Sequence, residues 1–202
     1  MRVSAITSRI ARQCAVENHY LHRAPPVSFC FGLHDGGELV GVVTFGVPPS
    51  RHALVSACRE SPESVIELNR LWVHDRMPRN TESWFVSRAL EMMPPRIVIS
   101  YADTAHGHAG YIYRALNFYY AGWTDMDRKT PRFDYVVPGK HSRQAFRNGT
   151  PQFSDRVRRK PKVKYWTVTG NRRDRKRLAA ACGWPCMSWK ETPPPVQTKT
   201  PA

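Results

Sequence analysis

SYADTAHGHAGYIYRALNFYYAG, the stretch from Ser100 to Gly122, holds more chemically active side chains than any other run of this sequence. Just before it, the apolar residues 97–99 predict a short buried strand. Gly107 and Gly110 predict a turn, and residues 111–116 have the spacing of a helix. A strand that ends in a polar loop and opens a helix is typical of a site of chemistry, because side chains converge there beside free backbone N–H groups. The converging side chains are those of Ser100, Asp103, His106, His108 and Tyr113.

Composition limits the class of protein and of partner. A chain of 202 residues is long enough for one domain with a proper core and an appendage. The formal net charge of +15 and the pI of about 10.1 favour a polyanionic partner, with nucleic acid ahead of a membrane surface. No apolar run approaches the ~20 residues of a membrane span. Five scattered cysteines without a C-x-x-C pair are typical of a reduced, intracellular protein.

The N-terminal segment predicts an amphipathic helix, because Ile6, Ile10 and Cys14 fall on one stripe. His19 and Tyr20 lie at the exit of this helix. They are either part of a site or a cover for the edge of the core.

A hairpin is predicted next. Residues 27–33 and 38–45 have the character of strands, and they are joined across the turn signal H-D-G-G at 34–37. Residues 50–63 are polar and irregular, which predicts a loop.

Val65–Val73 predicts the central strand. Period two leaves both faces mostly apolar, so the strand is expected to be buried on both sides. The same period puts Glu67 and Arg70 on opposite faces, where they cannot pair with each other. A buried charge is costly unless it is paired, so each needs another partner or a functional role.

A helix is predicted over residues 82–93, with Asn80 or Thr81 as its N-cap. Arg76 and Arg79 lie just before its N-terminus, where free amides and the helix dipole favour anions. These residues predict either a phosphate-binding site or plain surface arginines.

The C-terminal third is strongly basic. Residues 156–177 contain eleven lysines and arginines against one acid, Asp174. Within them, Lys162–Thr169 has the alternation of an edge strand and residues 171–182 predict a basic helix, while residues 132–137 predict a further strand upstream. Basic residues interleaved with aromatic ones suit a nucleic-acid backbone. The residues predicted to contact DNA are Lys162, Lys164, Arg172, Arg173 and Arg175.

The predicted domain organisation has three parts. Residues 1–150 form a catalytic domain, and residues 151–190 form a basic strand–helix extension packed on it. The proline-rich residues 191–202 form a disordered tail.

The predicted order of elements is similar to that of the GNAT acyltransferase fold. More closely, the chain resembles the Mom family of phage DNA-modification proteins over residues 15–185. The shared motifs are His19-Tyr20-Leu21, Glu67-Leu68-Asn69-Arg70-Leu71, Asn80-Thr81-Glu82-Ser83, Ser100-Tyr101-Ala102-Asp103 and the Gly107-His108-x-Gly110-x-x-Tyr113-x-Ala115-x-Asn117-Phe118 run. The resemblance implies an α+β, three-layer, GNAT-like fold, in which helices flank a central mixed, mostly antiparallel sheet.

The resemblance further implies a transferase that converts adenine in DNA to N6-carbamoylmethyl (acetamido) adenine and so protects phage DNA from host restriction. It implies double-stranded DNA as the partner, no membrane, and the cytoplasm of the bacterial host. The oligomeric state is left open, a homodimer included. The positions that match the family's functional residues are His19, Tyr20, Arg70, Ser83, Asp103 and Tyr113.

Roles for these residues follow from chemistry. An adenine amine is a poor nucleophile, so Asp103 or Glu67 is expected to take its proton. The resemblance to GNAT enzymes, which often keep a tyrosine acid at this helix position, implies that Tyr113 protonates a leaving group. Ser83 and Arg70 are expected to hold the polar end of the donor.

The donor itself is left open. The phosphate of the donor is expected to bind Arg76, Arg79 and Asn80. However, the segment 76–80 lacks the glycines usual in the pyrophosphate loop of GNAT enzymes. The donor is therefore acetyl-CoA or another acyl or acetamido donor. An alternative is Fe(II) bound by oxygen and imidazole donors. Its ligands would be His19, Tyr20, Asp103 and Tyr113.

Two other functions stay open. One is a GNAT-type acetyltransferase that acts on a protein or a small amine. The basic C-terminal third argues against it. The other is a non-catalytic DNA-binding protein, which would leave Asp103, His19, Ser83 and Tyr113 without a purpose.

Overall fold

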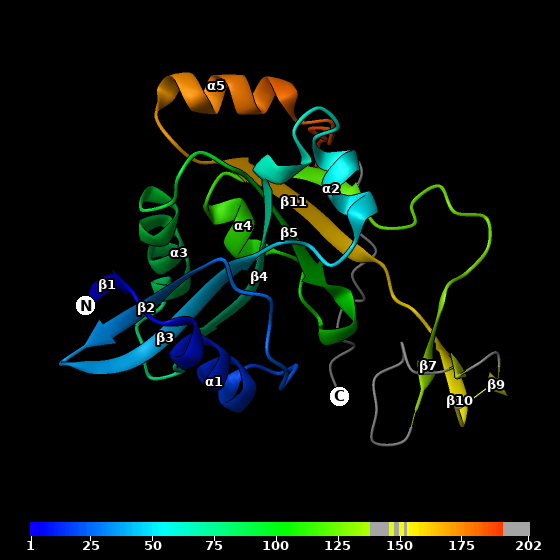
Figure 1. The fold of residues 1–202 in the computed structure, drawn as a ribbon, viewed down its shortest axis with the longest axis horizontal. Helices are drawn as coiled ribbons and strands as arrows, with labels where there is room; N and C mark the ends of the chain where they lie inside the picture. Colours follow the sequence, from blue (N-terminus) through cyan, green and yellow to red (C-terminus); the bar gives the residue numbers. More distant parts are fainter. Residues whose placement is uncertain (138–145, 148–149, 152, 192–202) are drawn as a thin grey trace.

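A seven-stranded sheet forms the centre of the molecule (Figure 1). The computed structural model describes residues 1–137, 146–147, 150–151 and 153–191. Across the sheet the strands are β1 (Arg2–Ala5), β2 (Phe29–Asp35), β3 (Glu38–Gly46), β4 (Val65–Val73), β5 (Ile97–Asp103), β11 (Lys162–Val168) and β6 (Tyr119–Trp123). Neighbouring strands are antiparallel, except that β4 and β5 are parallel. The predicted hairpin, central strand and mixed, mostly antiparallel sheet are confirmed.

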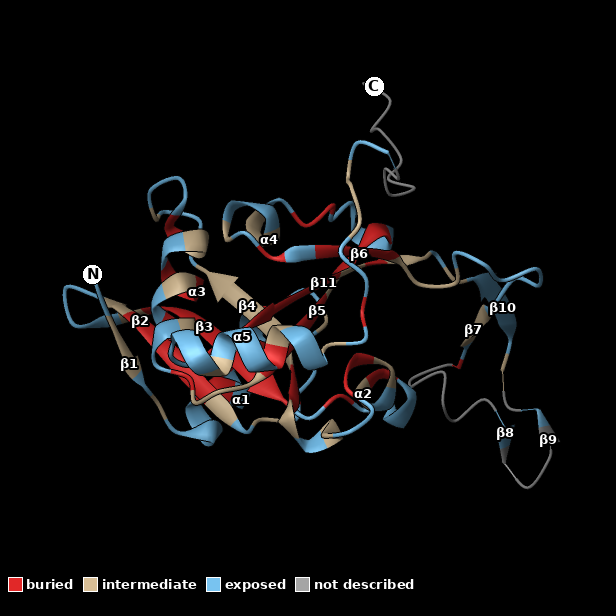
Figure 2. Cartoon of the chain, turned by 90° about the horizontal axis from the view of Figure 1, so that it is seen from above, coloured by how far each residue is buried: buried red, intermediate tan, exposed pale blue. Residues whose placement is uncertain are grey.

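Helices cover both faces of the sheet, which confirms the three-layer α+β prediction. They are α1 (Ser8–Asn18), α2 (Arg51–Ala57), α3 (Thr81–Glu91), α4 (Tyr111–Ala115) and α5 (Arg172–Ala181). Figure 2 shows α3 and α4 on one side of the sheet and α1 and α2 on the other. We name these sides the α3–α4 face and the α1–α2 face. Within the described residues, no helix has the length and apolar character to cross a membrane.

Each face has its own apolar core. Phe45, Phe85 and Tyr165 are fully buried on the α3–α4 face. Ile97 and Trp166 pack with apolar residues of α2 and α5 on the other face. The apolar alternation of β4, β5 and β11 supplies both cores, because each of these strands is covered on two sides.

The predicted N-terminal helix is confirmed as α1, but its predicted buried stripe is wrong. The buried residues of α1 are Ala11, Cys14 and Ala15, whereas Ile10 is 42% exposed and Ile6 precedes the helix. Thr7 caps α1 by accepting a hydrogen bond from the Ile10 N–H, and this cap fixes where the helix begins.

Residues 50–63 are not an irregular loop. They form α2 and a short 3₁₀ helix, η1 (Pro62–Ser64). Ser50 caps α2, and Ala53 and Ala57 pack against the sheet, so tertiary burial stabilises a short helix whose sequence lacks a clear apolar stripe.

The prediction that Lys162–Thr169 is an edge strand is also wrong. β11 lies between β5 and β6, with Val163 and Tyr165 fully buried on the α3–α4 face and Trp166 buried on the other. Alternation within a strand does not reveal how many neighbours the strand has. The division of the chain at residue 150 stays a prediction, although β11 of the predicted extension belongs to the central sheet. Residues 192–202 lie outside the described part.

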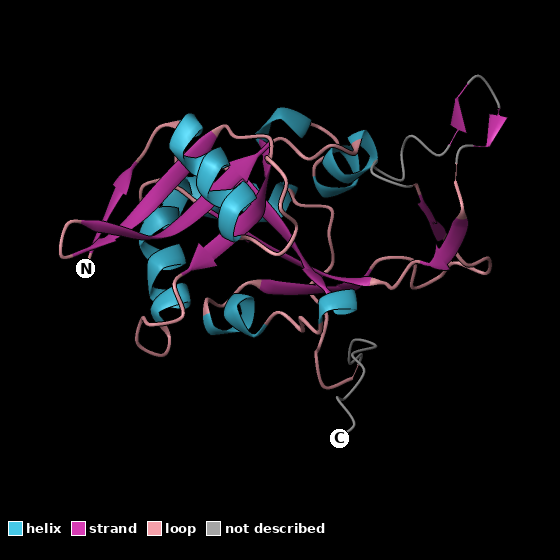
Figure 3. Ribbon diagram, turned by 90° about the horizontal axis from the view of Figure 1, so that it is seen from below, coloured by secondary structure: helices cyan, strands magenta, loops and turns pink. Residues whose placement is uncertain are grey.

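A two-stranded antiparallel ribbon projects from the body (Figures 1 and 3). It pairs β7 (Phe133–Val136) with β10 (Asp155–Arg158), and the predicted strand at 132–137 is confirmed. Two further short strands, β8 (Phe146–Arg147) and β9 (Thr150–Pro151), pair with each other.

Candidate active site

A β-bulge in β4 shapes the site. Arg70 pairs with Thr44 of β3, whereas Leu68 pairs with the very next residue of β3, so Asn69 is an extra residue in β4. The side chain of Asn69 is held at both ends. Its amide oxygen accepts a hydrogen bond from the Thr44 hydroxyl at 2.6 Å, and its amide nitrogen donates to the Pro26 carbonyl at 2.8 Å.

The bulge reverses the alternation of β4. Leu68 before it and Leu71 after it both pack against the core of the α3–α4 face. In a regular strand, two residues three positions apart would point to opposite faces. Glu67 and Arg70 therefore both face the α1–α2 side, and the prediction that they point to opposite faces is wrong. Their charges act on one another, since each shifts the pKa of the other.

Glu67 is a carboxyl with an unusual protonation equilibrium. Burial raises its pKa to about 7, against the opposing effect of the positive charges of Lys162 and Arg70. Such a group exchanges protons near neutral pH, as a general base must.

Asp103, the last residue of β5, is held in its ionised form. Its Oδ2 lies 2.8 Å from Lys162 Nζ, and its Oδ1 accepts a hydrogen bond from the Ala105 N–H at 3.0 Å. Burial opposes ionisation, but the hydrogen bond and charge of Lys162 outweigh it and lower the pKa of Asp103. Of the two predicted bases, Glu67 has the pKa that suits proton abstraction, while Asp103 is a fixed negative charge.

Aromatic and imidazole rings gather beside Asp103. The ring of Tyr20 stacks on His19 with centroids 4.2 Å apart, and it lies 4.4 Å from His106 and 5.3 Å from His108. His106 Nδ1 is 3.7 Å from Asp103 Oδ2. The two loop histidines thus contact the His-Tyr pair, which joins the C-terminal end of α1 to the loop after β5.

His19 and Tyr20 are both neutral at neutral pH. Burial and the positive charge of Arg70 lower the pKa of His19 to about 4, and its Nδ1 accepts a hydrogen bond from the Leu21 N–H at 3.1 Å. Burial and the negative charge of Asp103 raise the pKa of Tyr20 to about 12. Neither group gains or loses a proton readily, so their geometry suits positioning of a ligand better than proton transfer.

Tyr113 reaches the site from the α3–α4 face. Its hydroxyl lies 2.7 Å from the Ser100 hydroxyl, which donates a hydrogen bond to the Leu68 carbonyl at 2.9 Å. Leu68 and Ser100 are the last residues paired between the parallel strands β4 and β5, so this hydroxyl lies where the two strands separate. Burial raises the pKa of Tyr113, which is therefore protonated at neutral pH.

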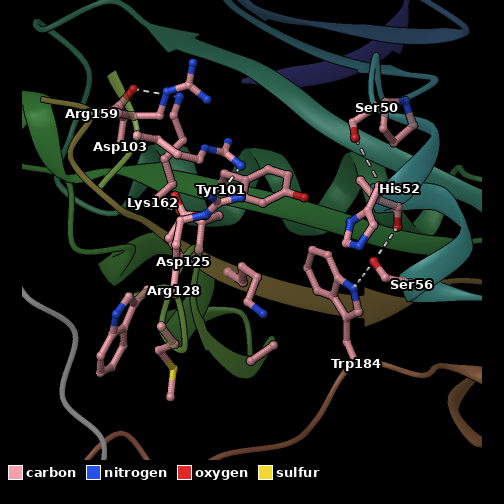
Figure 4. A pocket seen from close by; sticks show the side chains of 18 of the residues that line it. Ser50, His52, Ser56, Tyr101, Asp103, Asp125, Arg128, Arg159, Lys162 and Trp184 are labelled. Atoms are coloured by element: carbon pink, nitrogen blue, oxygen red, sulfur yellow. Dashed lines mark hydrogen bonds and ion pairs between the residues drawn. The ribbon is translucent and has the colours of Figure 1, made fainter. Parts of the chain in front are cut away.

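A cleft of about 1370 Å³ opens on the α1–α2 face over Glu67 and Asp103. Figure 4 shows Tyr101 between its two ends. One end carries Ser50, His52 and Ser56 with Trp184, and the other carries Asp103, Asp125, Arg128, Arg159 and Lys162. The second end includes the base of the β7–β10 ribbon. The volume exceeds that of an ordinary small-molecule site, so the cleft has room for a large substrate.

The residues predicted to bind the donor lie apart from this cleft. The Ser83 hydroxyl donates a hydrogen bond to the Asn80 carbonyl at 3.0 Å, in the first turn of α3. Arg76 forms an ion pair with Glu38, while Arg79 is exposed. Ser83 belongs to α3 on the α3–α4 face, and among the described contacts none joins these residues to Glu67 or Asp103.

The residues predicted to contact DNA fall into two groups. Lys162 bonds Asp103 inside the cleft, and Lys164 is partly buried with its Nζ 5.4 Å from the centre of the Trp184 ring. Arg172, Arg173 and Arg175 are exposed on α5. Their contact with DNA stays a prediction.

The predicted iron ligands do not fit a metal well. The Asp103 carboxylate already forms an ion pair with Lys162. The Tyr113 hydroxyl is already within hydrogen-bond distance of the Ser100 hydroxyl, at 2.7 Å. Within the described residues, no group of three or more His, Cys, Asp and Glu side chains is arranged to hold a metal ion. We therefore derive no step through iron.

Sequence reasoning missed three contributors to the cleft. Lys162 is predicted to contact DNA but pairs with Asp103, and His52 and Trp184 line the cleft although they are not among the predicted site residues. Period two alone puts Lys162 on one face of its strand, but the antiparallel register that sets it opposite Asp103 links residues far apart in the chain. No local signal could have found that register.

The sequence also matches known proteins. Residues 1–172 match the model of the Mom protein family. A methylcarbamoylase of Escherichia phage Mu is 37% identical over 131 residues, which cover 60% of this chain and 54% of that protein. The chain thus spans about half the length of this curated relative.

Solved structures similar to this chain include three enzymes of low identity. They are a ribosomal-protein-alanine N-acetyltransferase from Brucella melitensis (9% identical, TM-score 0.48, covering 83% of this chain and 99% of that one), a phosphinothricin acetyltransferase from Sinorhizobium meliloti (12%, 0.47, 84% and 88%) and a GNAT-like decarboxylase (13%, 0.46, 83% and 99%).

Proposed function

Because the chain belongs to the Mom protein family, we propose that it is a transferase that modifies adenine in DNA. The product is N6-carbamoylmethyl (acetamido) adenine, and its role is the protection of phage DNA from host restriction. The name of the phage Mu relative, a methylcarbamoylase, supports this chemistry. The net charge of +15 supports a nucleic-acid substrate.

One observation carries the proposal. Glu67, whose pKa of about 7 suits a general base, lies with Asp103 and Lys162 on a cleft with room for a nucleotide. In the proposed step, Glu67 takes a proton from the adenine amine as its nitrogen bonds the transferred carbon of the donor. Asp103 stays ionised, and its negative charge stabilises positive charge that develops on the amine.

In this proposal, the two substrates bind on opposite faces of the sheet. Adenine enters the cleft on the α1–α2 face, and the donor lies on the α3–α4 face with its reactive end where β4 and β5 separate. Tyr113, protonated at this point, gives its proton to the leaving group. Arg70 Nε, on the α1–α2 side of the sheet, is buried without a hydrogen-bond partner among the described residues, so it is available to an oxygen of the transferred group on the adenine side.

Acetyl-CoA, one of the predicted donors, would transfer an acetyl group and give N6-acetyladenine. The carbamoylmethyl product therefore requires an acetamido donor, in which the methylene carbon of the –CH2–C(O)NH2 group is bonded to the leaving group, and that bond breaks as the adenine nitrogen bonds the same carbon. The polar end of the donor is placed at the N-terminus of α3, beside Arg76, Arg79 and Ser83. The Asn80 side chain makes no capping hydrogen bond there, which leaves first-turn amides open to an anion.

Mass spectrometry of nucleosides from the DNA of cells that express the protein tests the proposal. A new adenosine species is expected. Tyr113→Phe, which removes the proposed acid, and Asp103→Asn, which removes the stabilising charge, should each reduce it at least about a hundredfold. Arg88→Ala, which removes an exposed surface ion pair on α3, should leave its yield unchanged. Unmodified adenine in cells that contain folded, soluble protein would refute the proposed activity.

A further inference from the structure

The β7–β10 ribbon has two chemically different faces. Directly paired residues of antiparallel strands share a face. Arg156 pairs with Tyr135 and Arg158 pairs with Phe133. One face therefore carries Phe133, Tyr135, Arg156 and Arg158, and the other carries Asp134, Val136, Asp155 and Val157.

The arginines of the first face are free to bind. Arg156 and Arg158 are exposed, and within the described part of the chain neither forms an ion pair with a carboxylate. The next residue, Arg159, differs because it pairs with Asp134 at 2.5 Å. The Arg156 guanidinium lies 4.7 Å from the centre of the Phe133 ring, a cation–π contact that orders it against the ribbon.

Aromatic packing orders the outer part of the ribbon. The ring of Tyr135 lies 5.3 Å from Phe146 and 4.6 Å from Phe153, and these two rings are 5.5 Å apart. An element that is ordered before binding loses less conformational entropy when it binds. The ribbon therefore presents its arginines at a small entropic cost.

We propose that this ribbon enters the major groove of duplex DNA, where Arg156 and Arg158 read base edges beside the target adenine. The inference rests on the proposed function for the identity of that adenine. The major groove is wide enough for a two-stranded ribbon, and it is also the groove in which adenine presents its N6 amine. An arginine fork matches the O6 and N7 acceptors of guanine in the same groove.

The ribbon and the cleft are close enough to act on one site. Arg156 precedes Lys162, which bonds Asp103, by six positions, so the extended chain between their Cα atoms spans at most about 21 Å. Base pairs rise about 3.4 Å each. The backbone of both ribbon arginines therefore lies within about six base-pair steps of Lys162.

α5 has a different relation to the cleft. Figures 1 and 2 show α5 away from the ribbon, over the central part of the sheet. Contacts from α5 would position the duplex through phosphates, whereas ribbon contacts would distinguish base sequence.

Fluorescence anisotropy of the full chain with a labelled duplex tests the ribbon directly. The double variant R156A/R158A is expected to bind at least about tenfold more weakly. The control R9A/R12A removes the same charge from exposed positions of α1 and should change affinity less than about threefold. Substituting 7-deazaguanine for guanine removes the N7 acceptor. This change should weaken DNA binding by the parent protein but not by R156A/R158A.

A charge-preserving variant separates base reading from attraction to phosphate. R156K/R158K keeps the positive charge but lacks the fork. It should retain the salt dependence of binding and show a smaller response to 7-deazaguanine, because an ammonium donates to N7 without the geometry of the fork. If R156A/R158A, which has no donor at these positions, keeps the full sensitivity of the parent, base reading by these arginines is overturned.

Nucleoside mass spectrometry of the same proteins distinguishes failure of the inference from failure of the proposed function. If the parent makes no modified adenosine yet needs Arg156 and Arg158 to sense N7, the ribbon's role stands and the proposed function fails. If R156A/R158A binds, senses N7 and modifies adenine as the parent does, the inference is overturned.

Discussion

At the scale of single residues, Glu67 is the proposed base, and its protonation state changes near neutral pH. Only its ionised form accepts a proton, so the rate of adenine modification should rise with pH through about 7 and then level off. Glu67→Gln should lower the rate by about 10²–10⁴-fold and remove this rise. The measurement is the pH profile of modified-adenosine formation. A parent profile without an inflection near 7 would exclude Glu67 as the base.

The same pKa shift makes a stability prediction. Folding raises the pKa of Glu67 from its ordinary 4.5 to about 7, so the native state holds the proton more tightly than the unfolded chain. The contribution of Glu67 to the free energy of unfolding is therefore present at low pH, and it is lost as the pH rises through about 7. Relative to the parent, Glu67→Gln should gain stability above that pH. Glu63→Gln, at an exposed position, should follow the parent at every pH.

At the scale of elements, Gly110 sets the start of α4 and hence the position of Tyr113. Its φ of 84° is left-handed, and a Cβ there would lie 2.3 Å from the Tyr165 ring. Gly110→Ala should therefore combine backbone strain of about 1–2 kcal/mol with overpacking of about 1–3 kcal/mol, seen in urea unfolding.

Gly107 provides the matched control. Its φ is 75°, but nothing lies within 4 Å of a Cβ built there. Gly107→Ala should cost only the backbone strain of about 1–2 kcal/mol. Equal losses in the two variants would contradict the close approach of α4 to Tyr165.

At the scale of the whole molecule, the excess positive charge should make DNA binding steeply dependent on salt. Each phosphate contact contributes about 0.9 to the slope of log affinity against log salt, so R172A/R173A/R175A on α5 should reduce the slope by up to about 2.7. It should weaken all duplexes alike, because phosphate contacts carry no sequence information. The control is R9A/R12A, and an unchanged slope would exclude α5 from the interface.

Much of the fold follows from local sequence. Val65–Val73 and the hairpin before it are recognisable because apolar alternation and a turn signal lie within a few residues of one another. Gly107 and Gly110 mark the turn of the candidate site for the same reason, and both adopt positive φ. The α2 helix was missed because its stability comes from packing rather than from its own pattern.

The sequence by itself determined the types of most elements, the basic character and several of the residues that gather in the candidate site. Tertiary structure alone decided how they combine. The bulge at Asn69 depends on pairing with β3, and it turns Glu67 and Arg70 to one face. The place of β11 between β5 and β6 brings Lys162 to Asp103. Both outcomes depend on strand register between distant segments, which no periodicity within one segment can encode.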